Sequence, residues 1–320
     1  MTTGGPKKVR LAEQVYLVLP LGFSAVFAAV LFLSGDPLSS PTSIMFLLLT
    51  PIVGVAARRW RRWRAWLTLV MIAMSYEALA GVIDAVADTN KLLSLFDFDK
   101  YLWGFNLTGW FQTTFSSASM TNLMALLYQL LMPVVFVTSF FIWYRNRHTF
   151  GKFVTAILLT SYAALVTFLL LPTVPPWLGG AASNLVRASG MGSIPAFLAP
   201  IAILFQPNEF AAFPSLHAAY MIICTYFLLK IDRRIGGAAV VLTVGILLST
   251  LYLGQHYLVD LLAGAAYAIV PCLISERLQV FGVHDASPSG TGPAYPVGSG
   301  LARTSDPSTA ARKRPETTDA

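Results

Sequence analysis

The stretch Ser249–Asp260, S-T-L-Y-L-G-Q-H-Y-L-V-D, closes one apolar run of the chain and opens the next. It places His256 four residues before Asp260. On a helix, this spacing puts both side chains on one face, one turn apart. A carboxylate in that position can hold the imidazole in one tautomer and stabilise its charged form, as a nucleophile or base requires. The alternative is a polar helix start that merely lies at a membrane surface.

The composition predicts a polytopic membrane protein. Of the 320 residues, 56% are hydrophobic and only 12% are charged, whereas a soluble domain carries about 25% charged residues. The net charge of +7 would suit a nucleic-acid partner if the basic residues lined a soluble surface. They instead occupy short gaps between apolar runs, which indicates lipid contact and orientation, so no nucleic-acid partner is expected. Cys224 and Cys272 lie inside apolar runs and are predicted to be packing residues.

Apolar runs near membrane-spanning length predict an all-α bundle of about eight transmembrane helices. The second run is short and contains Pro51. The tail after residue 281 is rich in Ser, Pro, Gly and Thr and is expected to be disordered. The runs cover about 14–33, 43–57, 65–87, 122–144, 153–171, 213–230, 236–253 and 256–274.

The basic residues divide unevenly between the two sides of this topology. All 22 lysines and arginines except Lys91, Lys100 and Arg187 fall on the side that holds both termini. The positive-inside rule makes that side cytoplasmic. Three stretches then meet on the extracytoplasmic face: P-T-V-P-P-W at 172–177, P-S-L-H at 214–217 and G-Q-H-Y-L-V-D at 254–260.

Two of these stretches are expected to begin helices whose N-termini point to the extracytoplasmic face. Unpaired N–H groups and the positive end of the helix dipole favour an anion there. Pro214 suits a first helical turn, because its missing N–H costs nothing in that position. His217 and His256 each lie within about one turn of such a start, where one can attack a phosphate and the other can protonate the leaving group. Two matching histidines favour a functional site over a structural role.

The P-S-L-H of 214–217 and the Y-L-G-Q-H-Y-L-V-D of 252–260 resemble the second and third signature motifs of the type 2 phosphatidic acid phosphatase superfamily. The resemblance covers about residues 65–277. It implies a six-helix membrane core that acts on phosphate through a phosphohistidine, without a metal or another cofactor. It makes His256 the nucleophile, Asp260 its orienting carboxylate and His217 the general acid. It also implies that Ser215 and Gly254 belong to the phosphate-binding part of the site.

The chain departs from that superfamily at two phosphate-binding cations. The first motif, a Lys followed by Arg-Pro, has no clear match, and Thr250 stands where an arginine is usual. The stretch 172–177, which includes Pro176 and Trp177, is similar to the P-x-x-P-P-W of the inositol phosphorylceramide synthase branch. Members of that branch move a phospho-head-group between lipids. We therefore expect a lipid phosphotransferase, with a lipid or polyprenyl phosphate phosphatase and a non-catalytic lipid-binding or transport protein as the alternatives.

A few further residues are candidates for substrate binding. Arg187 is the only arginine predicted on the extracytoplasmic side, so it is a candidate phosphate ligand, with a lipid head-group contact as the alternative. Glu77 and Asp84 share a face of the third run, and ionisable groups at membrane depth usually face an internal cavity. We expect them to line an acceptor or head-group cavity together with Pro176 and Trp177. Tyr128 and Gln129 in the fourth run are weaker candidates of the same kind.

These inferences divide the chain into three regions. Residues 1–64 carry a basic segment and two accessory transmembrane helices, 65–281 form the six-helix catalytic core, and 282–320 form a cytoplasmic tail. The predicted location is the cell membrane, crossed several times, with both termini cytoplasmic and the active site extracytoplasmic. The expected partners are the bilayer and a membrane phospholipid or polyprenyl phosphate. No carboxylate cluster suggests a metal ion.

Overall fold

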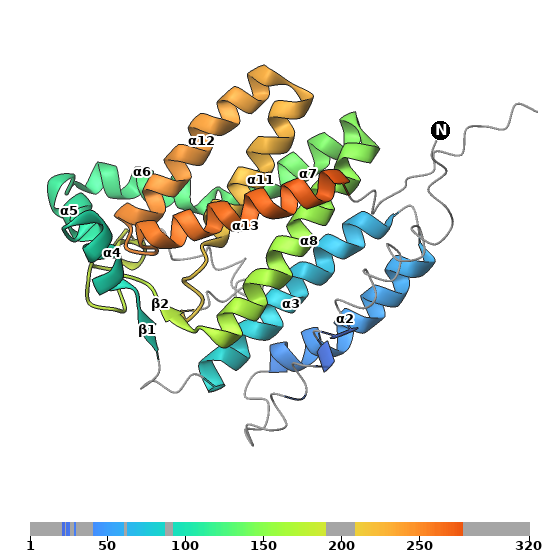
Figure 1. The fold of residues 1–320 in the computed structure, drawn as a ribbon, viewed down its shortest axis with the longest axis horizontal. Helices are drawn as coiled ribbons and strands as arrows, with labels where there is room; N and C mark the ends of the chain where they lie inside the picture. The colour runs from blue at the N-terminus through green and yellow to red at the C-terminus, as the bar shows by residue number, and fades with distance from the viewer. Residues whose placement is uncertain are drawn as a thin grey trace, which may run out of the picture. The chain divides into compact units, whose positions relative to one another are not determined.

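The computed structural model describes residues 21–22, 24–25, 29, 41–60, 63–86, 92–189 and 209–277 (Figure 1). The side chains of 41–47, 57–58 and 76–86 lie outside this description. Most described residues are helical, which confirms the prediction of a mainly helical fold. The helices are α2 (Pro41–Arg59), α3 (Arg64–Val86), α4 (Phe96–Trp103), α5 (Leu107–Thr114), α6 (Ala118–Gln129), α7 (Leu131–Arg145), α8 (Arg147–Leu170), α9 (Leu185–Ala188), α11 (Leu216–Ile231), α12 (Arg233–Tyr252) and α13 (Leu258–Arg277).

Several of these helices are suited to a membrane. Among the described residues, α8, α12 and α13 are long and apolar enough to cross one, and α6 with α7 adds a fourth span if the two count together. Helix α11 and the Arg64–Ser75 part of α3 are apolar but shorter. The first predicted run lies mostly outside the described residues. The chain is therefore a membrane protein with several apolar helices, and the number of eight spans stays a prediction.

Polar caps separate the long helices on the side predicted to be cytoplasmic. The side chain of Asn146 accepts a hydrogen bond from the backbone N–H of Thr149 and so starts α8 directly after α7. Asp232 starts α12 directly after α11 in the same way, because its Oδ1 accepts from Arg234 N at 2.8 Å. Such caps satisfy backbone donors that a helix start leaves unpaired. They explain why one apolar run ends and the next begins within one or two residues.

The predicted fourth span is interrupted. Instead of one helix over 122–144, α6 and α7 are separate helices with a bend of about 40° between them at Leu130. Pro133 explains the break, because it has no N–H to donate to the carbonyl of Gln129 one turn earlier. The bend directly follows the last turn of α6, which carries Tyr128.

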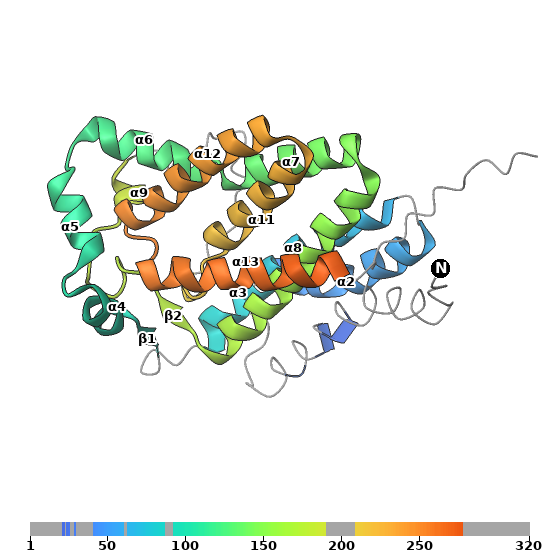
Figure 2. The ribbon, with the colours of Figure 1, turned by 45° about the horizontal axis from the view of Figure 1, so that its top comes forward.

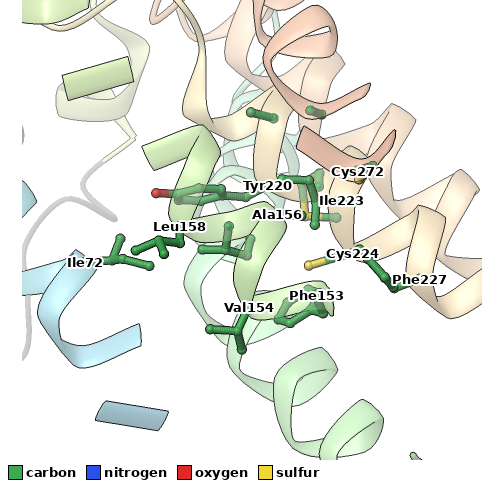
Figure 3. Close-up of a cluster of buried hydrophobic side chains, with 14 of the residues drawn as sticks. Ile72, Phe153, Val154, Ala156, Leu158, Tyr220, Ile223, Cys224, Phe227 and Cys272 are labelled. Atoms are coloured by element: carbon green, nitrogen blue, oxygen red, sulfur yellow. The ribbon is translucent and has the colours of Figure 1, made fainter. Parts of the chain in front are cut away.

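The hydrophobic core lies between α3, α8, α11 and α13 (Figure 3). Small side chains such as Ala156 and Cys224 stand among large ones such as Phe153 and Phe227, so neighbouring helices approach closely. Cys224 and Cys272 are both buried and free, in line with their predicted packing role. In Figures 1 and 2, α2 and α3 lie side by side, and α3 in turn contacts α8.

One ion-pair cluster joins three helix ends. Glu276 at the end of α13 accepts a hydrogen bond from Lys152 Nζ of α8 at 2.7 Å and another from Lys230 of α11. The basic end of α11 therefore lies beside the start of α8 and the end of α13. It follows that the starts of α11 and α13, which carry the two conspicuous histidine motifs, both lie at the opposite end.

Candidate active site

A short β pair fixes Pro172–Trp177 against the residues before α11. Strand β1 (Leu93–Ser94) pairs in parallel with β2 (Thr173–Val174), an element that the sequence did not predict. Thr173 also forms a bridge to Ala211, and its Oγ1 accepts a hydrogen bond from Phe213 N at 2.8 Å. The Pro172–Trp177 stretch thus lies directly beside the beginning of Pro214–His217.

A second set of contacts fixes the same stretch against Gly254. The backbone N–H of Trp177 donates to the Gly254 carbonyl at 3.1 Å. Gln112 of α5 donates from Nε2 to the carbonyls of Ser183, at 2.8 Å, and Tyr252, at 2.9 Å, and accepts from Ser183 N at 2.9 Å. The three motif stretches therefore converge, as predicted. Gln112 was not predicted, because a single polar residue in an aromatic segment gives no pattern.

The start of α11 differs from the prediction. The helix begins at Leu216, and Ser215 caps it by accepting a hydrogen bond from Ala218 N at 3.3 Å. Pro214 lies before the cap, after a cis peptide bond, and is not in the first turn. The Ser215 side chain is fully buried. The structure shows that it caps the helix, whereas its contact with a phosphate stays a prediction.

His256 and Asp260 do meet, but not on one helix face. His256 Nδ1 lies 3.5 Å from Asp260 Oδ2. Helix α13 begins at Leu258, so the histidine precedes the helix and the aspartate belongs to its first turn. Asp260 Oδ2 reaches back over the helix start and also accepts a hydrogen bond from Tyr257 N at 2.8 Å. The arrangement is a capping contact that brings the Asp260 carboxyl group beside the His256 ring.

The two histidines face each other. His256 Nε2 lies 3.4 Å from His217 Nδ1, and the ring planes are inclined by 64°. If the Asp260 carboxylate holds the proton of His256 on Nδ1, Nε2 carries the lone pair and His217 Nδ1 is the donor between the rings. This tautomer leaves His256 Nε2 as a nucleophile, with a proton carrier next to it.

Burial controls the charge of this site. His256 is 6% exposed, and burial lowers its pKa to about 4, against a smaller opposing effect of the Ala212 carbonyl. The imidazole is therefore neutral near pH 7, which is the form that a nucleophile requires. Among the described residues, His256 Nδ1 and Asp260 Oδ1 are buried without a hydrogen-bond partner. Catalytic contacts of this kind often tighten only when substrate is bound.

Two further residues border the site. The ring of Tyr128 stacks on that of His217, with centroids 4.6 Å apart and planes inclined by 22°. Asp99 of α4 is 3% exposed, and its Oδ1 accepts hydrogen bonds from Val259 N at 3.0 Å and Trp103 Nε1 at 3.2 Å. Burial raises the pKa of Asp99, against the smaller effect of these hydrogen bonds. Tyr128 was a weak candidate from the sequence, and Asp99 was not predicted.

The predicted substrate-binding residues lie in different surroundings. The Arg187 side chain is 70% exposed, pairs with Glu209 at 2.9 Å and lies over the ring of Trp177 at 4.9 Å. Pro176 is buried, and its carbonyl accepts from Ala181 N at 2.9 Å. Arg187 therefore lies beside Trp177, whose backbone N–H donates to the Gly254 carbonyl.

Three further positions were considered from the sequence. Thr250 faces its own helix, and the side chains of Glu77 and Asp84 lie outside the described residues. Thr250 is buried and donates from Oγ1 to the Leu247 carbonyl at 2.8 Å, so its side chain faces its own helix and does not replace the missing arginine. Glu77 and Asp84 belong to α3, but their side chains lie outside the described residues. Within the described part of the chain, no group of three or more His, Cys, Asp or Glu residues is placed to hold a metal ion.

Comparison with known proteins gives one result. The family model of the PAP2 superfamily matches residues 93–274, from β1 into α13. The matched region includes all three converging stretches and both histidines. No curated protein and no solved structure matches the chain.

Proposed function

Because the chain belongs to the PAP2 superfamily, and is therefore a lipid enzyme of the type 2 phosphatidic acid phosphatase-like phosphatase or phosphotransferase class, we propose that it transfers a phospho-head-group between membrane lipids. The match confirms the superfamily that two motifs indicated. The proposal adds the reaction, the kind of donor and the roles of the residues. The single observation that carries it is the contact of His256 Nε2 with His217 Nδ1.

The charges around the histidines favour a phosphodiester as the donor. Two carboxylates, Asp99 and Asp260, lie at the start of α13, and Arg187 is already paired with Glu209. A phosphomonoester carries nearly two negative charges near pH 7, and a phosphodiester carries only one. A site in which Thr250 replaces an arginine suits the single charge better. A phosphodiester lipid also carries the head group that a transferase would move.

In the first step, His256 Nε2 attacks phosphorus and forms a P–N bond. The bond between phosphorus and the leaving oxygen breaks, and His217 Nδ1 gives its proton to that oxygen. Asp260 stabilises the positive charge that develops on the His256 ring. The step balances because the nucleophile supplies the electron pair of the new bond and the leaving oxygen departs as an alcohol.

In the second step, an alcohol acceptor attacks the phosphohistidine. His217 Nδ1 takes the proton of the attacking hydroxyl, the P–N bond breaks, and its electron pair returns to His256 Nε2. Backbone N–H groups at the starts of α11 and α13 would stabilise the charged oxygens in both steps. We assign Ser215, Gly254 and Arg187 to the surroundings of the phosphate, and Pro176 and Trp177 to the acceptor side. Glu77 and Asp84 are proposed to contact the acceptor or head group.

Purified protein and a radiolabelled lipid test the reaction type. Phosphatidic acid, as the monoester, and phosphatidylinositol, as a diester, are each incubated with and without a diacylglycerol or ceramide acceptor. We expect the label of the diester to move to the acceptor lipid. Free phosphate from phosphatidic acid as the main product, unaffected by the acceptor, would instead identify a phosphatase.

Hydrolysis is the second candidate, because water can attack the phosphohistidine as an alcohol does. The observation that favours it is that the same two histidines serve both reactions. Lipid binding or transport without catalysis is the third candidate. Full in-cell function of the His256→Ala variant would support that role and contradict both enzymatic ones.

We also propose that the site lies on the extracytoplasmic side of the cell membrane, with both termini in the cytoplasm. The basic residues around Lys152 and Lys230, at the opposite end, support this orientation through the positive-inside rule. Single cysteines at Thr113 and Arg234, both exposed, test it in intact cells with a membrane-impermeant maleimide. Labelling at position 113 alone is expected, and labelling at position 234 alone would reverse the orientation.

A further inference from the structure

The ring of Tyr128 lies directly against the ring of His217, the proposed proton donor. Its ring stacks on the His217 ring at 4.6 Å, with the two planes within 22° of parallel. His256 approaches the same imidazole at an inclination of 64°. The His217 ring is therefore held on one face by Tyr128 and faces His256 with Nδ1.

The fold fixes Tyr128 in this position by two means. Helix α6 is joined to the end of α12, because Thr121 and Tyr252 share a hydrogen bond at 2.9 Å and Met124 packs against Tyr252 and Leu253. The bend at Leu130 then directs α7 away from α6, so Tyr128 occupies the last turn of α6 beside the start of α11.

Two titratable side chains of the described residues have ring contacts with His217. They are His256, from the loop before α13, and Tyr128, from α6, and Asp260 lies next to His256. The described charged side chains of α8 and α11 that pair with α13 gather around Glu276 at the other end. In the part of the chain that the structure describes, the ring of Tyr128 therefore covers one face of His217, and the paired charges of α8, α11 and α13 lie at the other end of these helices.

We propose that Tyr128 is a positioning residue for the proton donor: its ring holds the imidazole of His217 with Nδ1 directed at His256 and at the leaving oxygen. The proposal rests on the proposed function, in which His217 is the general acid. The phenol hydroxyl takes no part in it. The stacked aromatic face alone holds the imidazole, because aromatic rings attract one another in offset-stacked arrangements.

Three variants of Tyr128 separate the ring from the hydroxyl. Tyr128→Phe keeps the stacked ring and is expected to retain kcat within about threefold. Tyr128→Leu removes the ring, and we expect a fall in kcat of about tenfold with little change in KM. Tyr128→Met also removes the ring but fills a similar volume. If the loss of the ring, and not a folding defect, slows Tyr128→Leu, the two variants should behave alike. Tyr144→Leu, in the 75% exposed position of α7, is the matched control for loss of a tyrosine.

A change of leaving group gives an independent readout. A p-nitrophenyl phosphodiester needs no protonation of its leaving oxygen, whereas an alkyl phosphodiester such as short-chain phosphatidylinositol does. We expect Tyr128→Leu and Tyr128→Met to slow only the alkyl substrate. Equal losses on both substrates, or equal behaviour of the Phe and Leu variants, would overturn the role of Tyr128.

The variant His256→Ala distinguishes this proposal from the function on which it rests. If His256→Ala is fully active, the phosphohistidine scheme fails and the role of Tyr128 fails with it. If His256→Ala is inactive while Tyr128→Leu keeps wild-type activity on the alkyl phosphodiester, only the role of Tyr128 fails. Size-exclusion profiles in detergent confirm that each variant is folded before its kinetics are compared.

Discussion

The carboxylate of Asp99 accepts a hydrogen bond from the backbone N–H of Val259, so a short helix caps the start of another helix that lies 160 residues further along the chain. Helix α13 thus has two carboxylates at its start, because Asp260 accepts from Tyr257 N. Both interactions act on the loop that carries His256. The position of the proposed nucleophile therefore depends on α4 as well as on its own helix.

Replacement of Asp99 tests this dependence. In Asp99→Ala, the Val259 N–H and the Trp103 Nε1–H lose their acceptor, and a buried donor left unpaired costs about 1–3 kcal/mol. Asp99→Asn keeps an acceptor oxygen and should cost much less. Thermal unfolding in detergent measures the stability, and kcat reports the position of His256. Equal stability of the Ala and Asn variants would show that the hydrogen bonds do not hold α13.

A second prediction concerns Asp260. Asp260→Asn keeps an oxygen for Tyr257 N but removes the charge that fixes the His256 tautomer. By analogy with catalytic histidines that lose their carboxylate, we expect kcat to fall by roughly 10²–10⁴ while the protein stays folded. Single-turnover kinetics with a labelled phosphodiester measure the effect on phosphohistidine formation. A fall of less than about threefold would contradict the orienting role.

Gly254 gives a third prediction with a control in the same chain. Gly254 and Gly180 both have positive φ, at 74° and 75°. A Cβ on Gly254 would lie 2.7 Å from the Ser183 carbonyl oxygen, whereas a Cβ on Gly180 would meet nothing within 4 Å. Both Ala variants carry the backbone strain of about 1–2 kcal/mol, but only Gly254→Ala should also displace the turn before His256 and lose activity. Activity and melting temperature of the two variants, compared side by side, check this.

The acid limb of the pH profile is a fourth prediction. Burial lowers the pKa of His256 to about 4, so the ring stays neutral and nucleophilic well below its ordinary pKa. We expect the acid limb of kcat/KM to lie near that value rather than near pH 6.5. The effect on stability has the opposite sense: as the pH falls below 6.5, the unfolded chain binds a proton that folded His256 does not, so folding weakens down to about pH 4. An acid limb near pH 6.5 would contradict this value.

The sequence predicted the features that depend on local pattern. Apolar runs gave the long helices, and the positions of the basic residues put both histidine motifs at one end, where they do lie. The contact of His256 with Asp260 was predicted from helical spacing, but it forms across a helix start. The two side chains are close because Asp260 reaches back over the start of α13, and not because they share a helix face.

Features that depend on distant polar contacts could not be predicted in this way. Gln112 joins Ser183 across 71 positions, and the β1–β2 pair consists of two residues on each side. Neither leaves a periodic pattern, because one residue or two cannot show a period. Such contacts nevertheless gather the loops of the site. The break at Leu130 was marked by Pro133, yet the apolar run around it predicted one continuous span.

A last prediction concerns the pairing of Arg187 with Glu209, which decides whether the arginine is a phosphate ligand. The pair is exposed, with 70% and 36% of the side chains accessible, so the ion pair itself adds little stability. If Arg187 binds the donor phosphate, Glu209 competes with that phosphate. Glu209→Gln should then lower KM for the donor by about threefold, and Arg187→Gln should raise KM by about tenfold with kcat nearly unchanged.

The double variant Arg187→Gln/Glu209→Gln makes this prediction decisive. With Arg187 absent, Glu209 has no cation to withhold, so the double variant should have the KM of Arg187→Gln alone. Such non-additivity is the signature of two residues that act through one contact. If Glu209→Gln lowers KM equally in both backgrounds, Glu209 repels the lipid phosphate directly and Arg187 is only a partner for Trp177. The comparison needs just initial rates at varied donor concentration in mixed micelles.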